Sequence, residues 1–269
     1  MLKANPRTTP ACSTTILTKD EHGSNMAGEW NYRSVIGMLN YLANTTHPEL
    51  AYAVHQCARF CNAPKRSHES SVKHILKYLL HVSKNDELHQ GLIYKPNHDK
   101  GIEVHVDAGF ASDWDAEDCD EPTSVMSRTG YVITYANCPI IWASKLQTEV
   151  TLSTTEAEYV ALSQTMREAV PLTHLLDELR TILPLPPSKP KVKCTIFEDN
   201  NSCIEIAKSP KMRPRTKHIA IKYHHFRQGV INGIYNILPI DTKEQTADIF
   251  TKALSESTFQ YLRFKLNGW

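Results

Sequence analysis

The sequence contains no apolar stretch long enough to cross a membrane, and its N-terminus has no apolar core of a signal peptide. It also has no paired Cys/His set with zinc-site spacing, and no internal repeat is visible. These absences argue against a membrane protein and a zinc-stabilised domain. The 7 cysteines are scattered and odd in number, so we expect reduced, mostly buried thiols. We therefore expect an intracellular, cytoplasmic protein, with the nucleus as an alternative.

The composition is that of a globular protein, with 41% hydrophobic and 22% charged residues in a chain of 269 residues. This length suits one large domain or two ordinary ones. The net charge of +1 hides an uneven distribution of charged residues. No acidic residue lies between Ile206 and Ile240, whereas the segment from Ser112 to Pro122 is acidic. A basic strip can bind a polyanion, although an ordinary solvated face fits the same pattern equally well.

The first third of the chain has the apolar periodicity of helices. Residues 1–28 are rich in Thr, Pro, Asn and Ser without an apolar period, which indicates a linker or a truncated lead-in. Helices are then expected from Tyr32 to about Asn44, from Pro48 to about Asn62, and from Ser67 to beyond Val82. Residues 29–98 should therefore form a small all-α subdomain.

Residues 99–269 change to a pattern of strands and helices. The expected strands are 102–107, 129–135, 139–143, 192–198 and 234–240. The first three should form a meander, because a short turn joins the second to the third. A long helix is expected from Ser153 to about Arg180, kinked or split at Pro171, with a helix through 219–230 and another through 247–254. This order predicts an α/β fold class with a mixed sheet.

Four carboxylates stand out by their positions in these elements. Asp107 and Asp199 lie at the carboxyl ends of strands, and Glu156 and Asp248 lie near the starts of helices. Ligands gather at this edge of an α/β sheet, and hard oxygens without soft ligands suit Mg²⁺ or Mn²⁺. Taken singly, each acid has an ordinary reading: Ser153 and Glu156 form a capping box, and Asp at a strand end forms turns.

Several segments together resemble the C-terminal part of a copia-type retrotransposon polyprotein, where the end of the reverse transcriptase region precedes RNase H. The matching segments, in family order, are Tyr32–Ala43, His47–Val54, Val106–Ala108, Ser127–Val132, Trp142–Gln147, Leu152–Tyr159, Glu198–Asn200, Arg215–Ile219 and Ala247–Leu254. They cover nearly the whole chain.

The resemblance implies an RNase H-like mixed five-stranded sheet at 99–269, preceded by a thumb- or connection-like helical subdomain at 29–98. It implies hydrolysis of the RNA strand of RNA–DNA hybrids with two Mg²⁺ or Mn²⁺ ions. Asp107, Glu156, Asp199 and Asp248 would be the catalytic acids and metal ligands. The remainder of the polyprotein is a further expected partner. If the chain is part of an active element, the expected location is a virus-like particle. The expected nucleic-acid contacts are Ser127, Ser153, Asn200, Lys211, Arg213, Arg215 and Lys217.

The chain also departs from the family pattern. The paired-aspartate motif of the polymerase palm is absent, so we expect no copying of nucleic acid. Ala220 replaces a common Asp, and no histidine precedes Asp248 within 240–247. An alternative is an inactive or host-adopted fragment that binds nucleic acid without cutting it. A transposase or integrase of the same fold is a weaker alternative.

Overall fold

A five-stranded sheet forms the centre of the molecule. The structure is a computed structural model that describes residues 5–84, 91–115, 121–183, 194–209, 219 and 221–269. The strands are β1 (Ile102–Gly109), β2 (Arg128–Tyr135), β3 (Cys138–Leu146), β4 (Cys194–Glu198) and β5 (Tyr235–Pro239). A two-residue turn joins β2 to β3, with positive φ angles of 51° at Ala136 and 66° at Asn137. Such a turn matches the twist of a hairpin, so the predicted meander is confirmed.

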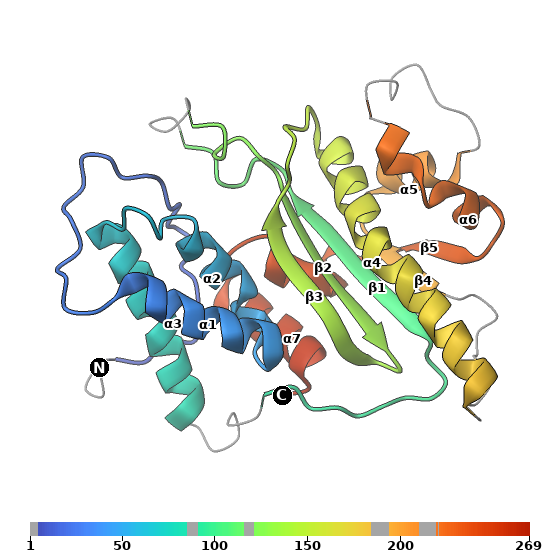
Figure 1. Cartoon of the computed structure of the whole chain (residues 1–269), viewed down its shortest axis with the longest axis horizontal. Helices are drawn as coiled ribbons and strands as arrows, with labels where there is room; N and C mark the ends of the chain where they lie inside the picture. The colour runs from blue at the N-terminus through green and yellow to red at the C-terminus, as the bar shows by residue number, and fades with distance from the viewer. Residues whose placement is uncertain (1–4, 85–90, 116–120, 184–193, 210–218, 220) are drawn as a thin grey trace.

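The strand order is β3-β2-β1-β4-β5 (Figure 1). β2 runs antiparallel to both β1 and β3, whereas β4 runs parallel to β1 and β5 runs parallel to β4. The predicted fold class is therefore confirmed: an RNase H-like mixed five-stranded sheet with helices, preceded by N-terminal helices. Because β1 and β4 are adjacent and parallel, their carboxyl ends meet at one edge of the sheet.

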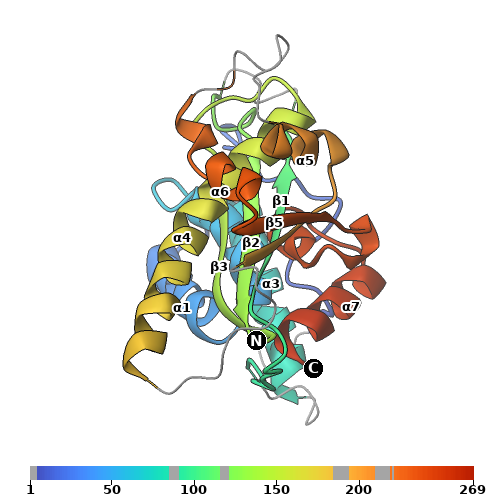
Figure 2. The same ribbon diagram turned by 90° about the vertical axis from the view of Figure 1, so that its right-hand side faces the viewer.

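One face of the sheet is covered by the helices of the second half of the chain. These are α4 (Thr154–Ile182), α5 (Asn201–Lys208), η4 (Ile221–His224) and α6 (Arg227–Ile231). Figure 2 shows α4 and α6 on one side of the sheet and α7 on the other. Val104, Val106, Ile196 and Ile237 of the strands are buried against Leu162 of α4 and its neighbours. This core holds the amino-terminal half of α4 firmly on β1.

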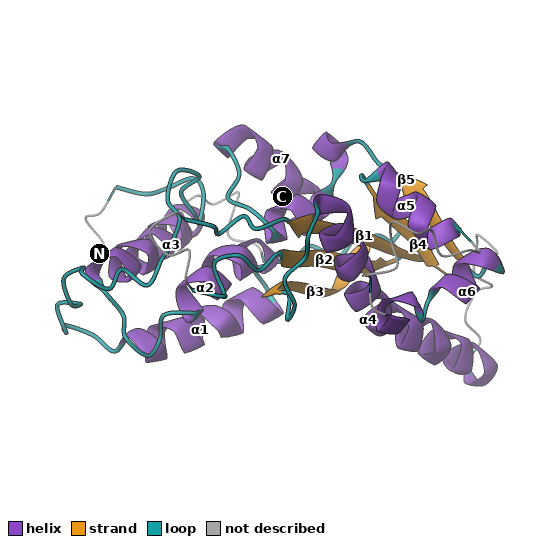
Figure 3. Ribbon diagram, turned by 90° about the horizontal axis from the view of Figure 1, so that it is seen from above, coloured by secondary structure: helices purple, strands orange, loops and turns teal. Residues whose placement is uncertain are grey.

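The opposite face is covered by helices from both ends of the chain. They are α1 (Tyr32–Thr45), η1 (Pro48–Leu50), α2 (Ala51–Ala58), α3 (Arg66–Lys84), η5 (Thr242–Glu244), η6 (Thr246–Phe250) and α7 (Glu256–Asn267). In Figure 3, α1–α3 lie together at one end of the sheet and α5 and α6 at the other. Leu39 and Val54 share one buried cluster with Val132, Phe250 and Leu266. The helical part and the sheet therefore have a common core.

The lead-in is packed against the third helix. The backbone N–H of Arg7 donates to the carbonyl of Lys77, and His74 Nε2 lies 3.0 Å from the carbonyl oxygen of Thr9. The described part of 1–28 thus crosses the helical subdomain. The limits proposed for the domains remain predictions.

Two helix predictions are wrong in detail. α4 runs through Pro171 without a break, so the split that was one of the two expectations there is wrong; Ala169 and Thr173 on either side are buried against the rest of the fold. The missing N–H of proline removes one hydrogen bond, which this packing offsets. The single helix expected through 219–230 is instead two short pieces, η4 and α6. The apolar spacing correctly indicated which side chains are buried, but spacing alone does not fix whether a helix is continuous.

The last predicted helix is also shorter than expected. Only the short 3₁₀ helix η6 carries Asp248, and it ends before Thr251 and Lys252 turn toward the acidic residues. Short 3₁₀ turns of this kind are common as connectors. Within the described residues, no helix is both long and apolar enough to span a membrane. Six of the cysteines are described and all are free thiols, with Cys57, Cys138, Cys194 and Cys203 buried.

Candidate metal centre

Asp107 lies two residues before the end of β1, opposite Gly130 of β2. Its side chain is buried, and the hydroxyl of Thr251 donates a hydrogen bond to Oδ2. Burial raises the pKa of Asp107, while the nearby ammonium of Lys252 opposes this shift. Gly130 leaves the space that η6 needs, because a Cβ there would lie 2.8 Å from Cβ of Phe250 and 3.0 Å from the carbonyl of Ala247.

Asp199 follows the last residue of β4 directly. The hydroxyl of Thr242 donates to its Oδ2 over 2.8 Å. The next residue, Asn200, caps α5: its Oδ1 accepts from the N–H of Cys203 at 3.0 Å. Because this turn and cap fix the backbone on both sides, the Asp199 carboxylate is held beside the end of β1.

Asp248 approaches from η6, which packs on β1 and β2. Its Oδ1 lies 2.9 Å from Nζ of Lys252, four residues later. Burial, followed by the negative charge of Asp107, raises the pKa of Asp248 to about 7. The ion pair between Asp248 and Lys252 places one ammonium group next to the acidic residues.

Glu158 completes the group from α4, and it replaces Glu156 in the position that the sequence suggested. The side chain of Glu158 is buried, and its Oε2 has no hydrogen-bond partner within the described parts of the chain. Burial and the charges of neighbouring acids, Asp107 first, raise its pKa well above the ordinary value. Glu156 instead accepts from the N–H of Leu152 at 2.8 Å, which is a capping contact.

Oxygens of Asp107, Glu158 and Asp199 all lie within 4.8 Å of one another. Glu198, the residue before Asp199, adds another buried carboxyl group, and burial raises its pKa well above the usual range. So many carboxylates destabilise one another unless a cation or protons neutralise them. The donor set is oxygen only and includes the unpartnered Oε2 of Glu158, so these residues fit a hard divalent cation such as Mg²⁺ or Mn²⁺.

The residues predicted to contact nucleic acid lie in different surroundings. Ser127 is buried and its Oγ lies 2.7 Å from Oγ1 of Thr151, so it holds two loops together. Ser153 and Asn200 are the N-caps of α4 and α5. Their side-chain oxygens are therefore engaged in capping. The remaining four, Lys211, Arg213, Arg215 and Lys217, lie outside the described residues.

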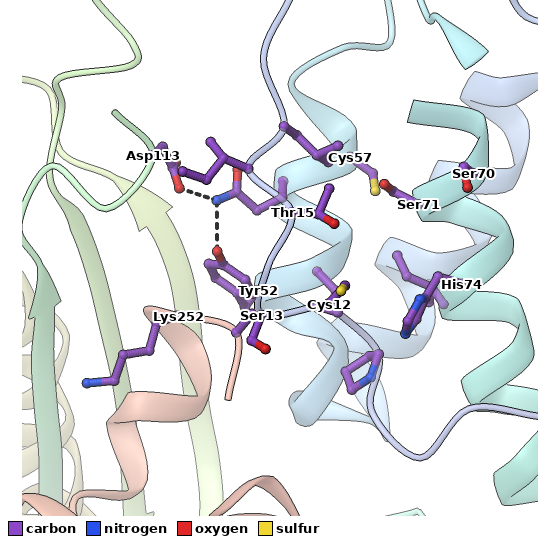
Figure 4. Close-up of a pocket in the computed structure, with 18 of the residues that line it drawn as sticks. Cys12, Ser13, Thr15, Tyr52, Cys57, Ser70, Ser71, His74, Asp113 and Lys252 are labelled. Atoms are coloured by element: carbon purple, nitrogen blue, oxygen red, sulfur yellow. Dashed lines mark hydrogen bonds between the residues drawn. The ribbon is translucent and has the colours of Figure 1, made fainter. Parts of the chain in front are cut away.

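A hollow of about 490 Å³ lies between the lead-in, α2 and α3, with Lys252 among its lining residues (Figure 4). Hydroxyl groups line much of it, including those of Ser13, Thr15 and Ser71. Lys252 stands at its edge, and Figure 4 shows the ammonium pointing away from the hollow. Since that ammonium binds Asp248, Lys252 separates the hollow from the carboxylates.

Searches of known proteins give a consistent result, although no family model matches the chain. The Pol polyprotein of transposon RE1 from Arabidopsis thaliana is 32% identical over 99% of this chain. The Pol polyprotein of transposon TNT 1-94 from Nicotiana tabacum is 34% identical over 97% of it. The chain belongs to the copia-type retrotransposon Pol polyproteins. It spans 17–18% of the length of these two Pol polyproteins.

Among solved structures, an RNase H1 isolated from compost by a metagenomic approach is 17% identical to this Pol region. The match covers 56% of this chain and 93% of that chain with a TM-score of 0.38. Because this score is low, the assignment of the fold rests on the order and directions of the strands in the Pol region itself.

Proposed function

We propose that this Pol region is a metal-dependent endoribonuclease that hydrolyses the RNA strand of RNA–DNA hybrids. The observation that carries the proposal is the group of carboxylates formed by buried Asp107 and Glu158 and half-buried Asp199, with three oxygens within 4.8 Å of one another. A group of this kind is unfavourable unless a cation or protons neutralise it, because buried acids lose hydration and neighbouring carboxylates repel one another.

Each acidic residue of the site would have its own role in metal binding. Asp107, Glu158 and Asp199 would hold a divalent ion, and Asp248 would contribute a further oxygen ligand for a second one. Two such ions supply Lewis acidity toward a phosphodiester and lower the pKa of the attacking water. The Thr251 hydroxyl fixes the orientation of Asp107, and the Lys252 ammonium favours the ionised form of Asp248.

The choice of an RNA–DNA hybrid rests on family membership together with the acidic group. Selection for RNA would come from contacts with 2′-hydroxyls in a minor groove. Lys211, Arg213, Arg215 and Lys217 remain the proposed phosphate contacts, since a basic strip binds the backbone without regard to sequence. The remainder of the Pol polyprotein is the proposed physical partner.

The test is cleavage of a labelled RNA–DNA hybrid with Mg²⁺ or Mn²⁺, beside duplex DNA and duplex RNA. We expect cleavage of the hybrid's RNA strand alone, abolished by EDTA and by Asp199→Asn. If the folded protein binds the hybrid but does not cleave it, the result would instead support the alternative that this is an inactive or host-adopted fragment that only binds nucleic acid. Cleavage that persists in the Asp199→Asn variant would show that the acidic group is not the active site.

A further inference from the structure

Gln245 lies between η5 and η6, and its side chain is completely buried. Its Nε2 donates to two backbone carbonyls on different strands: Val106 of β1 at 2.9 Å and Phe197 of β4 at 3.2 Å. One side-chain amide therefore bridges two strands that lie 139 and 48 residues earlier in the sequence.

The bridge lies at the point where the two strands part. The parallel pairing of β1 with β4 runs from Ile102 opposite Cys194 to His105 opposite Phe197. Beyond this pairing, Asp107 lies in β1 and Asp199 directly follows the end of β4. The two carbonyls that accept hydrogen bonds from Gln245 therefore lie just before these acids in the chain. The first is one residue before Asp107, and the second is two residues before Asp199. A change in the distance between the two carbonyls would therefore change the distance between the carboxylates of Asp107 and Asp199.

Gln245 also begins the turn that carries a third acid. Its Oε1 accepts from the N–H of Ala247 at 3.4 Å, and its own carbonyl accepts from the N–H of Asp248 at 3.2 Å. The same residue therefore contacts β1, β4 and η6, which supply Asp107, Asp199 and Asp248.

We infer that Gln245 is a positioning residue that sets the separation of Asp107, Asp199 and Asp248 for metal binding. The inference rests on the proposed metal-dependent function, and it specifies which residue keeps the acids of that site at the separation that metal binding needs. Gln245 contacts none of the three carboxylates through its side-chain hydrogen bonds, so its effect passes through the backbone. A primary amide suits this position because it offers two N–H donors and one acceptor, and all three contacts use them.

The experiment compares Gln245→Met with Gln56→Met, using the full chain stripped of metal with EDTA. Methionine keeps the length of glutamine and removes its donors. Gln56 is also a buried glutamine, and its Nε2 donates to Asp113 and Tyr52, away from the strands that carry the acids. Mn²⁺ binding is measured by calorimetry, and unfolding by urea is followed by circular dichroism.

We expect Gln245→Met to weaken Mn²⁺ binding about tenfold or more, which is the usual size of such indirect effects on a metal site. Gln56→Met should keep the wild-type affinity even if it lowers the urea midpoint by a similar amount. Wild-type Mn²⁺ affinity in Gln245→Met would overturn the inference and leave the proposed function intact. Absence of Mn²⁺ binding by the wild type would refute both together.

If Gln245→Met does not fold, Gln245→Asn replaces it in the comparison. Asparagine keeps the amide but is one methylene shorter, so it reaches fewer of the two carbonyls. The expected result is again weaker Mn²⁺ binding, and an unchanged affinity in a folded Asn variant would overturn the inference equally.

Discussion

Glu156 and Glu158 stand two residues apart at the start of α4, yet their carboxylates lie in opposite surroundings. Glu158 is buried beside Asp107 and Asp199, whereas Glu156 is half-buried and caps the backbone at Leu152. An α-helix turns by about 100° per residue, so a separation of two residues moves a side chain to nearly the opposite face. Only one of the two glutamates can therefore face the acidic group.

This difference predicts opposite effects for the same substitution. Glu158→Gln should reduce hybrid cleavage at least 100-fold and weaken Mn²⁺ binding, because it removes a charged oxygen ligand. Glu156→Gln should leave both nearly unchanged and lower the free energy of unfolding by about 1 kcal/mol or less, as expected for a weakened cap. Cleavage assays and urea denaturation of the two variants, made in parallel, provide the measurement. Inactive Glu156→Gln beside active Glu158→Gln would restore Glu156 as the ligand.

The stability of the metal-free protein should fall as the pH rises from about 4 to 7. The pKa of Asp248 is raised from 3.8 to about 7 in the folded protein, so in this range the folded state binds more protons than the unfolded state. Each unit of pKa difference corresponds to about 1.4 kcal/mol. Asp107, Glu158 and Glu198 shift in the same direction.

Urea midpoints from pH 5 to 8 measure this dependence. With EDTA the midpoint should decrease with pH, whereas saturating Mg²⁺ should reduce or reverse the decrease, because the ion binds ionised carboxylates. Asp248→Asn removes one titrating group and should flatten the EDTA curve. A midpoint that rises with pH in EDTA would contradict the proposed burial of these acids.

The two parts of the chain are joined by a buried ion pair whose disruption should be costly. Asp113 Oδ2 accepts from Arg59, the C-cap residue of α2, and from Arg128 of β2, each at 3.0 Å, and Arg128 is completely buried. Asp113→Ala would leave Arg128 without its carboxylate and should lower the free energy of unfolding by about 3–5 kcal/mol. Urea denaturation of Asp113→Ala and of Asp113→Ala/Arg128→Met checks this. We expect the double variant to be less destabilised than the sum of the single changes.

Cutting the chain at the proposed domain boundary should unfold the sheet domain. Residues 99–269 alone would expose Val132, Phe250 and Leu266, which are buried in the core shared with the helical subdomain. Full burial of one such side chain contributes about 1.5–3 kcal/mol, so exposing several is comparable to the whole stability of an ordinary domain, about 5–15 kcal/mol. A 99–269 fragment should therefore show no cooperative melt, while 29–269 should melt cooperatively. A cooperative melt of 99–269 would establish an independent domain.

The sheet was predictable because its strands carry a clear local pattern. The alternation at Ile102, Val104 and Val106 indicates a half-buried strand, and the turn at Ala136–Asn137 fixes the hairpin. Continuity of helices was less predictable, since α4 continues through Pro171, where the neighbouring residues Ala169 and Thr173 are buried. Tertiary contacts decided such cases, and local sequence does not contain them.

Within the candidate site, Asp107 and Asp199 were expected beside each other and lie there, because adjacent parallel strands bring their ends together. Glu158 was missed, although a signal was available. A glutamate in a capping box is already engaged by the backbone, so the next acid along the helix was the better candidate for a ligand. Gln245 gave no such signal, because its role depends on two strands that only the fold brings within reach.

The acidic residues come from positions 107 to 248, so the site is complete only when nearly all long-range contacts have formed. Long-range pairings of this kind form late, after the entropy of closing large loops has been lost. A divalent ion that needs every ligand in place then binds after the transition state for folding. Such an ion should slow unfolding and leave the refolding rate almost unchanged. Metal would thus lengthen the lifetime of the native state without guiding the chain toward it.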